Sequence, residues 1–233
     1  MMMGLNQPYF MPYIGYWQLI NAVDIFIIGD DYHFINRGWI HRNRILLNGQ
    51  AKYFNIEVAH ASQNKRINEL YISDVFDPEK KLQLLREIYF KAPHFKEGFS
   101  LMQKILEYRE RNLALFLEYS IHCVCDYLGI KTKLIRSSSI HGNSELRREY
   151  RIYAQCNYTG ADTYINAIGG RALYNFDEFR QRNLKLGFIQ VGDIQYPQFG
   201  QEFIPNLSMI DLIMFNSKEE IQEMLTQYTI LWD

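Results

Sequence analysis

The stretch Asp24-Ile-Phe-Ile-Ile-Gly-Asp-Asp31 decides the fold class of this chain. Its apolar core, Ile25 to Ile28, shows no alternation of apolar and polar residues. It therefore predicts a strand buried on both faces, because a strand with one solvated face alternates. Such strands belong to sheets that carry helices on both sides, so we expect an α/β fold.

The segments on either side of this strand predict further elements of the same fold. Upstream, Met3 to Asn6 predicts a short strand and residues 13–22 predict a helix, with a proline-containing loop between them. Downstream, the runs 39–47 and 51–58 flank Asn48-Gly49, a dipeptide that strongly favours a β-hairpin.

The middle of the chain changes to helical spacing. We expect helices near 78–91, 95–109 and 112–128, the last closed by Gly129. Alternation then resumes, with strands expected at 131–136, 164–167 and 185–191 and helices at 144–158, 177–184, 208–215 and 218–228. The prediction is an α/β fold with a mixed sheet, flanking helices and a helical middle segment. One domain over 1–233 is expected, with a helical layer or insertion near 78–128.

Composition argues against several classes of partner. The net charge of −1 disfavours a binder of nucleic-acid duplexes or anionic membranes. No apolar run approaches the ~18 residues that a spanning helix needs, and the N-terminus lacks a signal-peptide pattern. We therefore expect a cytoplasmic protein without membrane insertion. Composition leaves the oligomeric state open.

The three cysteines favour neither a disulfide framework nor a metal site. Their number is odd, and their spacing lacks histidine partners suited to zinc. Cys123 and Cys125 are two residues apart on a predicted helix and face different sides, so we expect buried structural residues rather than a redox pair. We predict no metal ligands, and no motif identifies a cofactor.

Asp30 and Asp31 are the first candidates for chemistry. They follow the buried strand directly, and the carboxyl ends of strands are where open α/β sheets place their ligand crevices. Adjacent carboxylates could hold a divalent ion or act as a base toward an amine or hydroxyl. Alternatively, one acid caps the next turn. Further along the chain, Asp211 is expected to cap a helix rather than to enter the site.

The segment Arg37-Gly-Trp-Ile-His-Arg-Asn-Arg44 concentrates cationic and aromatic side chains. If a strand begins at Trp39, Arg42 and Arg44 lie on one face, whereas Trp39, His41 and Asn43 lie on the other. The two guanidinium groups could then bind a phosphate or carboxylate. The alternative is an exposed strand edge defended by charge.

Two further loops offer neutral polar groups. Gln7 lies in the first loop beside Tyr9, which suggests a pocket that binds through amides and rings rather than through charge. Asn166 precedes Gly169-Gly170, where glycine permits positive φ or close approach of the backbone to a ligand. Without a complete phosphate-binding motif, a phosphate site at these glycines is only weakly indicated.

Several of these motifs together resemble the WbqC-like protein family. The segments that carry the resemblance are Asn-Gln-Pro-Tyr-Phe-Met-Pro-Tyr-Ile-Gly-Tyr-Trp at 6–17, Gly-Asp-Asp at 29–31, Arg-Gly-Trp-Ile-His-Arg-Asn-Arg-Ile at 37–45, Tyr-Ile-Asn-Ala-Ile-Gly-Gly at 164–170 and Leu-Ser-Met-Ile-Asp at 207–211. Members of the family are encoded in bacterial O-antigen and other surface-polysaccharide gene clusters. The resemblance implies a transferase of glycine or another amino acid onto sugars. Many relatives carry His-Gln-Pro where this chain has Asn6-Gln7-Pro8, so a role for that histidine does not transfer.

The leading hypothesis is a transferase in surface-polysaccharide biosynthesis that moves an acyl group, such as glycyl, to an amino sugar or nucleotide-linked sugar. The alternatives are a metal-dependent glycosyltransferase and a non-catalytic sugar- or nucleotide-binding protein. The predicted catalytic residues are Asp30, Asp31 and His41. The predicted substrate-binding residues are Gln7, Tyr9, Arg37, Trp39, Arg42, Asn43, Arg44, Asn166, Gly169 and Gly170.

Overall fold

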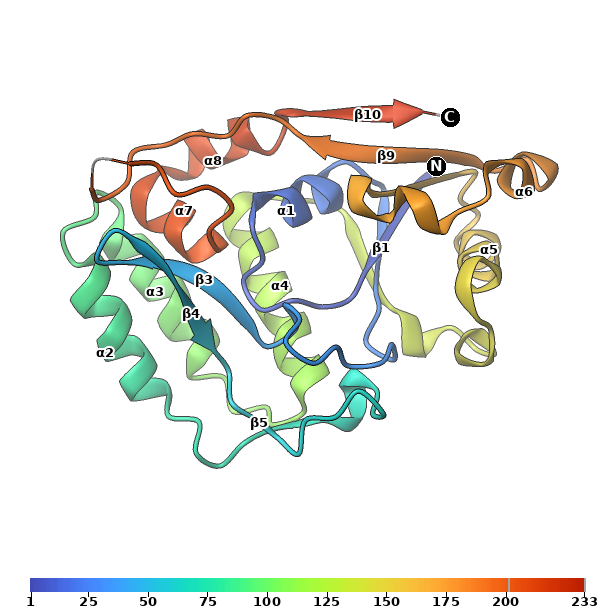
Figure 1. Ribbon diagram of the computed structural model, residues 1–233. Helices are drawn as coiled ribbons and strands as arrows, with labels where there is room; N and C mark the ends of the chain where they lie inside the picture. The colour runs from blue at the N-terminus through green and yellow to red at the C-terminus, as the bar shows by residue number, and fades with distance from the viewer. Residues whose placement is uncertain (201, 233) are drawn as a thin grey trace.

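Six strands form one mixed sheet in the order β10-β9-β8-β1-β2-β7, seen in the computed structural model of the chain (Figure 1). The structure describes residues 1–200 and 202–232. The sheet contains β1 (Met2–Asn6), β2 (Ile25–Ile28), β7 (Lys133–Arg136), β8 (Thr163–Ala167), β9 (Lys185–Val191) and β10 (Tyr228–Trp232). Two small antiparallel pairs lie outside it, β3 (Arg42–Leu47) with β4 (Gln50–Asn55) and β5 (Val58–Ala59) with β6 (Tyr71–Ile72). The helices are α1 (Ile14–Asn21), α2 (Pro78–Tyr89), α3 (Phe95–Leu106), α4 (Leu113–Leu128), α5 (Arg148–Thr159), α6 (Phe176–Gln181), α7 (Met209–Phe215) and α8 (Lys218–Met224).

The strand order places a topological switch point beside β1. From β1 the chain moves outward to β2 and then to β7, each parallel to its neighbour. It then returns across the sheet to β8, which pairs parallel with the other edge of β1, and continues outward to β9. Consequently, the loops after β1 and after β8 both leave the sheet at the carboxyl ends of these strands but run in opposite directions. This arrangement opens a crevice between the two loops.

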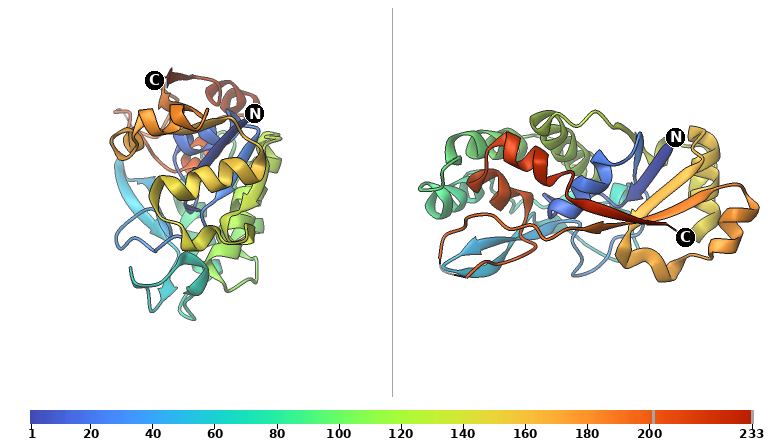
Figure 2. Two further views of the ribbon diagram at one scale, coloured as in Figure 1. Left: turned by 90° about the vertical axis from the view of Figure 1, so that its right-hand side faces the viewer. Right: turned by 90° about the horizontal axis from the view of Figure 1, so that it is seen from above.

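Each face of the sheet is covered by helices, as expected for strands with unbroken apolar runs (Figure 2). On one face, Phe26 and Ile28 of β2 pack in the core that also holds α1 and α4. On the other face, Ile25 and Ile27 pack with residues of α5 and α6. The alternation of neighbouring β2 residues between the two cores confirms a strand buried on both sides.

The helical middle segment consists of α2, α3 and α4, as predicted. Its last helix, α4, leads into β7 and therefore serves as the crossover from β2 to its parallel neighbour. Cys123 and Cys125 are both buried in the core on this helix. Among the described residues, no helix is long and apolar enough to cross a membrane.

Two local predictions differ from the structure. The hairpin forms around Asn48 and Gly49, with φ of 52° and 70°, but its first strand begins at Arg42 rather than Trp39. Helix α8 ends at Met224 rather than near residue 228, and the chain continues as β10, which the sequence analysis did not predict. β10 pairs antiparallel with β9 at the edge of the sheet, so its strand structure depends on a partner distant in sequence.

Gly129 provides a test of how α4 is terminated. It has φ of 72°, and an added Cβ would meet only the Gln222 side chain, at 3.4 Å. We expect Gly129→Ala to reduce the free energy of unfolding by about 1 kcal/mol, because alanine is strained in the left-handed region. Gly169→Ala serves as the control, since its Cβ would meet nothing within 4 Å and its φ is not left-handed. Equal urea midpoints for the two variants would contradict this account.

Candidate functional site

Three segments that are distant in sequence meet at the carboxyl end of β1: the first loop, the chain from Ile40 to Arg44, and the residue before α7. The backbone N–H of Phe10 in the first loop donates to the carbonyl of Ile40, at 2.9 Å. Ser208, just before α7, joins both: its N–H donates to the Arg44 carbonyl at 2.8 Å, and its hydroxyl donates to the Met11 carbonyl at 2.6 Å. Because Ser208 is fully buried, these bonds are shielded from water and hold the three segments together.

A cavity of about 290 Å³ lies between these segments. We call it the aromatic pocket, and its lining consists of Tyr9, Pro12, Tyr13, Trp39, Asn43, Arg44 and Asn206. Four predicted substrate-binding residues, Tyr9, Trp39, Asn43 and Arg44, therefore meet in one pocket. The Asn43 amide donates to the Phe10 carbonyl at 3.4 Å, and its Oδ1 accepts from the N–H of Arg44 at 2.9 Å, so this side chain fixes the pocket wall.

Arg44 and Arg42 differ in how their guanidinium groups are used. Arg44 stacks on Trp39 with its Cζ 5.7 Å from the ring centroid and donates from one Nη to the Asn206 carbonyl at 3.1 Å. Within the described residues, its buried Nε has no hydrogen-bond partner and no carboxylate forms an ion pair with its guanidinium group. Arg42 instead donates to the carbonyls of Gly38 and Arg37 and lies over Tyr53, so its contacts fasten the preceding bend.

Trp39 lies on the same side as the two arginines, so the predicted alternation was wrong for this residue. Its ring is 6.1 Å from that of Tyr53, on which Arg42 stacks. The reason is that residues before Arg42 are not in the strand and do not follow its two-residue period. Arg37 is exposed, has φ of 58°, and contributes its carbonyl rather than its guanidinium to this bend.

His41 lies beside the pocket rather than within its lining. Its ring is 5.3 Å from that of Phe34, and its Nδ1 is buried without a partner. Burial, assisted by the nearby Arg42 charge, lowers the pKa of this imidazole. The side chain is therefore held in its neutral form at physiological pH.

Asp30 is bound to the segment that follows β7. The N–H of Ser138 donates to one carboxylate oxygen at 2.9 Å, and the Ser138 hydroxyl donates to the other at 2.5 Å. Both oxygens are thus occupied, and the carboxylate is buried. In this arrangement Asp30 ties the end of β2 to the end of β7.

Asp31 forms a buried ion pair with Arg151 of α5, in which the side chains are 2% and 8% exposed. Arg151 also donates to the Ser137 hydroxyl at 2.8 Å, and its guanidinium lies 4.0 Å from the centroid of the Tyr32 ring. Asp31 Oδ2 and Arg151 Nε are buried and find no hydrogen-bond partner in the described part of the chain, so this pair is only partly satisfied. Its charges nevertheless neutralise one another within the scaffold.

Gln7, Asn166, Gly169 and Gly170 lie near the switch point but do not line the aromatic pocket. The Gln7 amide donates to the His33 carbonyl at 2.8 Å. Asn166 donates to the Tyr174 hydroxyl at 2.7 Å, and Tyr174 lines a separate cavity of about 480 Å³. Neither glycine has positive φ, but an added Cβ at Gly170 would lie 2.8 Å from the Asn166 amide, so close approach explains that glycine.

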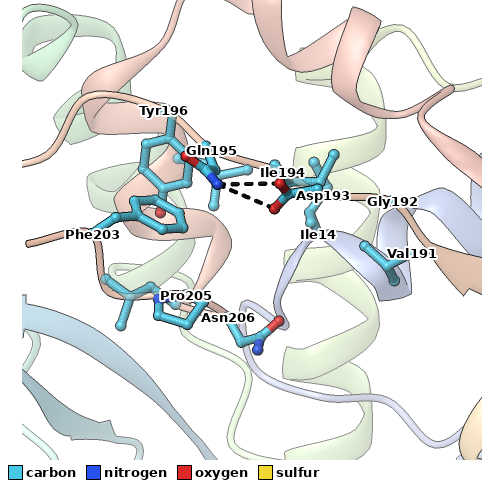
Figure 3. Close-up of a pocket in the computed structure, with 12 residues that line it drawn as sticks. Ile14, Val191, Gly192, Asp193, Ile194, Gln195, Tyr196, Phe203, Pro205 and Asn206 are labelled. Carbon is cyan, nitrogen blue, oxygen red and sulfur yellow. Dashed lines mark hydrogen bonds between the residues drawn. The ribbon is translucent and has the colours of Figure 1, made fainter.

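The sequence analysis missed a third cavity, of about 380 Å³, which follows β9 (Figure 3). We call it the β9–α7 cavity, and its lining consists of Ile14, Val191, Gly192, Asp193, Ile194, Gln195, Tyr196, Phe203, Pro205, Asn206, Leu207 and Leu212. Asn206 belongs to this cavity and to the aromatic pocket, so the two adjoin. The sequence contained a pattern that could have indicated this cavity, because Asp193 follows the end of β9 just as Asp30 follows the end of β2.

Asp211 does not cap α7, contrary to the expectation, because Ser208 takes that position and accepts from the N–H of Ile210. Asp211 is fully buried and accepts hydrogen bonds from the Tyr89 and Tyr196 hydroxyls, both at 2.8 Å. Gln198 donates to the same carboxylate at 3.3 Å. Asp211 therefore anchors the loop that forms the β9–α7 cavity, and burial raises its pKa to about 6.

Comparison with known proteins gives a match to one protein family. The model of the WbqC-like protein family matches residues 7–223, a range that includes the whole lining of the aromatic pocket. Rv1507c, an uncharacterized protein of Mycobacterium tuberculosis (strain ATCC 25618 / H37Rv), is 28% identical over 228 residues, which cover 95% of this chain and 96% of the relative. No solved structure gives a significant match.

The Asp31–Arg151 pair can be tested by removing one partner. We expect Arg151→Met to lower the free energy of unfolding by about 3 to 5 kcal/mol, because Asp31 is then left buried and unpaired. Adding Asp31→Leu should recover part of that loss. Lys80→Met is the control, since it breaks an exposed pair with Asp77 and should cost at most about 0.5 kcal/mol. Urea unfolding that shows equal effects for the two single variants would refute the assignment.

Asp211 predicts a specific pH dependence. Its pKa in the folded state, about 6, is raised above the ordinary 3.8. The stability that it contributes is therefore fully present below about pH 4 and is lost as the pH rises through 6, by about 2 to 3 kcal/mol. In Asp211→Asn this pH-dependent loss of stability should be absent. The measurement is the free energy of unfolding of both proteins at pH 4 and pH 7.5, and parallel profiles would show that Asp211 does not titrate in this range.

Proposed function

Because the chain belongs to the WbqC-like protein family, we propose that it is a transferase of bacterial surface-polysaccharide biosynthesis. The proposed reaction attaches an acyl group, such as an aminoacyl group, to an amino sugar that is carried on a nucleotide. The observation that carries this proposal is the aromatic pocket with its uncompensated Arg44.

The chemistry of the aromatic pocket fits a sugar joined to a phosphate. Tyr9, Tyr13 and Trp39 offer flat rings with polar edges, which suit the apolar face and the hydroxyl rim of a sugar. The Asn206 side chain can both donate to and accept from hydroxyl groups. Arg44 supplies a guanidinium that no carboxylate pairs with among the described residues, and this group is the one best suited to bind a phosphate through two parallel hydrogen bonds.

The size of the site also supports a ligand larger than a monosaccharide. The aromatic pocket, at about 290 Å³, lies just below the usual range for small-molecule sites, which is about 300 to 1,000 Å³. The adjoining β9–α7 cavity contributes a further 380 Å³. A nucleotide-linked sugar could extend through both.

In the proposed reaction, the amine nitrogen attacks the carbonyl carbon of an activated acyl ester or thioester. An N–C bond forms, the bond from that carbon to the leaving oxygen or sulfur breaks, and the leaving group departs with the electron pair. The amine proton passes to a base and then to the leaving group. Among the predicted catalytic residues, Asp30 and Asp31 already hold Ser138 and Arg151, whereas neutral His41 retains an unpartnered nitrogen.

A direct test of the activity is to incubate the protein with nucleotide-linked amino sugars and a panel of aminoacyl esters and thioesters, and to follow the sugar by mass spectrometry. A mass gain of one acyl group supports the proposal. A ligand that binds but returns unchanged would identify a binding protein. Turnover that stops on chelation and releases free nucleotide would identify a glycosyltransferase.

The role of Arg44 predicts a difference between two conservative variants. We expect Arg44→Lys to weaken binding of a nucleotide-linked sugar by about tenfold, since an ammonium group cannot form the planar two-pronged contact. Arg42→Lys is the matched control, because Arg42 is engaged with backbone carbonyls and should affect the bend instead. Isothermal titration calorimetry measures both. Equal affinities for the two variants would rule out the Arg44 phosphate contact.

A further inference from the structure

The β9–α7 cavity contains a carboxylate that forms no ion pair with any residue the structure describes. Asp193 lies just past the end of β9, is exposed, and accepts hydrogen bonds from Gln195 Nε2 at 3.2 and 3.4 Å (Figure 3). In the part of the chain that the structure describes, no lysine, arginine or histidine forms an ion pair with it. Its charge is therefore available to a ligand.

The cavity wall around Asp193 is held in place by partly buried hydrogen bonds. Tyr196 packs edge-on against Phe203, with ring centroids 5.3 Å apart, and its hydroxyl donates to buried Asp211. Gln198, further along the same loop, contacts Asp211 and also pairs with the backbone of Ile204 on both its amide atoms. The loop that presents Asp193 is thus fastened to the core rather than free to move, which favours binding of a defined ligand.

The two adjoining pockets offer charges of opposite sign. Arg44 opens onto the aromatic pocket and Asp193 onto the β9–α7 cavity, and Asn206 forms part of both linings. A ligand that satisfies both must carry a cationic group and an anionic group. Neither a neutral sugar nor a nucleotide without an amine meets that requirement.

We infer that Asp193 marks the subsite for the ammonium group of the substrate, while Arg44 holds its phosphate. This inference rests on the proposed function, in which the acceptor is an amino sugar, and adds the residue that binds its free amine. Before the attack the ammonium loses one proton to solvent and becomes the nucleophilic amine; acylation then gives an uncharged amide, which removes the charge that Asp193 attracts. The subsite that recognises the substrate therefore favours release of the product.

The test compares two ligands that differ only in the amine: a nucleoside diphosphate-linked 2-amino sugar and its N-acetylated counterpart. We expect the wild-type protein to bind the free amine about tenfold more tightly, a difference of about 1.4 kcal/mol. Asp193→Asn should abolish that preference by weakening binding of the free amine alone. The control is Asp126→Asn, the same change at an exposed position outside both linings, which should leave both affinities unchanged.

The outcomes of the titrations separate the two proposals. If the wild-type protein binds both ligands equally, or if Asp193→Asn keeps the preference for the amine, the ammonium subsite is refuted while the nucleotide-sugar site stands. If neither ligand binds the wild-type protein, the proposed function fails and this inference fails with it. The melting temperature of Asp193→Asn should equal that of the wild type, because the side chain is exposed and holds no other element.

Discussion

The parallel pairing of β1 with β2 on one edge and β8 on the other is the constraint on which the rest of the structure depends. The chain after Asn6 leaves at the carboxyl end of β1 and turns toward β2. The loop after β8 leaves at the same end of the sheet but runs in the other direction. Cavities at this end of the sheet therefore follow from strand order.

The aromatic pocket depends on a second constraint, the convergence of three segments at Ser208. Its N–H and hydroxyl join the β3 backbone and the first loop, and its oxygen also caps α7. One short side chain can make these bonds only where three backbones approach closely, which is why the junction is fully buried. The pocket walls are consequently positioned by core hydrogen bonds, although the loops that carry them contain residues as distant as Tyr9 and Asn206.

Some charged side chains hold the fold together, whereas others border cavities. Asp30, Asp31 and Asp211 are buried, and each is bound by hydroxyl, backbone or guanidinium donors within the scaffold. A buried charge must be paired or hydrogen-bonded, since one left without either costs several kcal/mol, a large part of the stability of a domain. Arg44 and Asp193 instead border cavities and lack ionic partners among the described residues. A charge that the fold does not use is available for a ligand.

The sequence by itself determined the α/β class, the helical middle segment and the hairpin, because apolar periodicity, helix caps and Asn48-Gly49 act over a few residues. It also indicated Tyr9, Trp39, Asn43 and Arg44 as candidate ligand contacts, because aromatic, amide and guanidinium side chains are typical of binding pockets. Only the tertiary structure decided which candidates meet. It gave buried Asp30 and Asp31 partners that are 108 and 120 residues away, and it joined Asn206 to Arg44 across 162 residues. It also made β10 a strand by supplying β9 as its partner. Burial and long-range pairing determine whether a polar side chain holds the fold or faces a ligand, and neither is encoded in the local sequence around that residue.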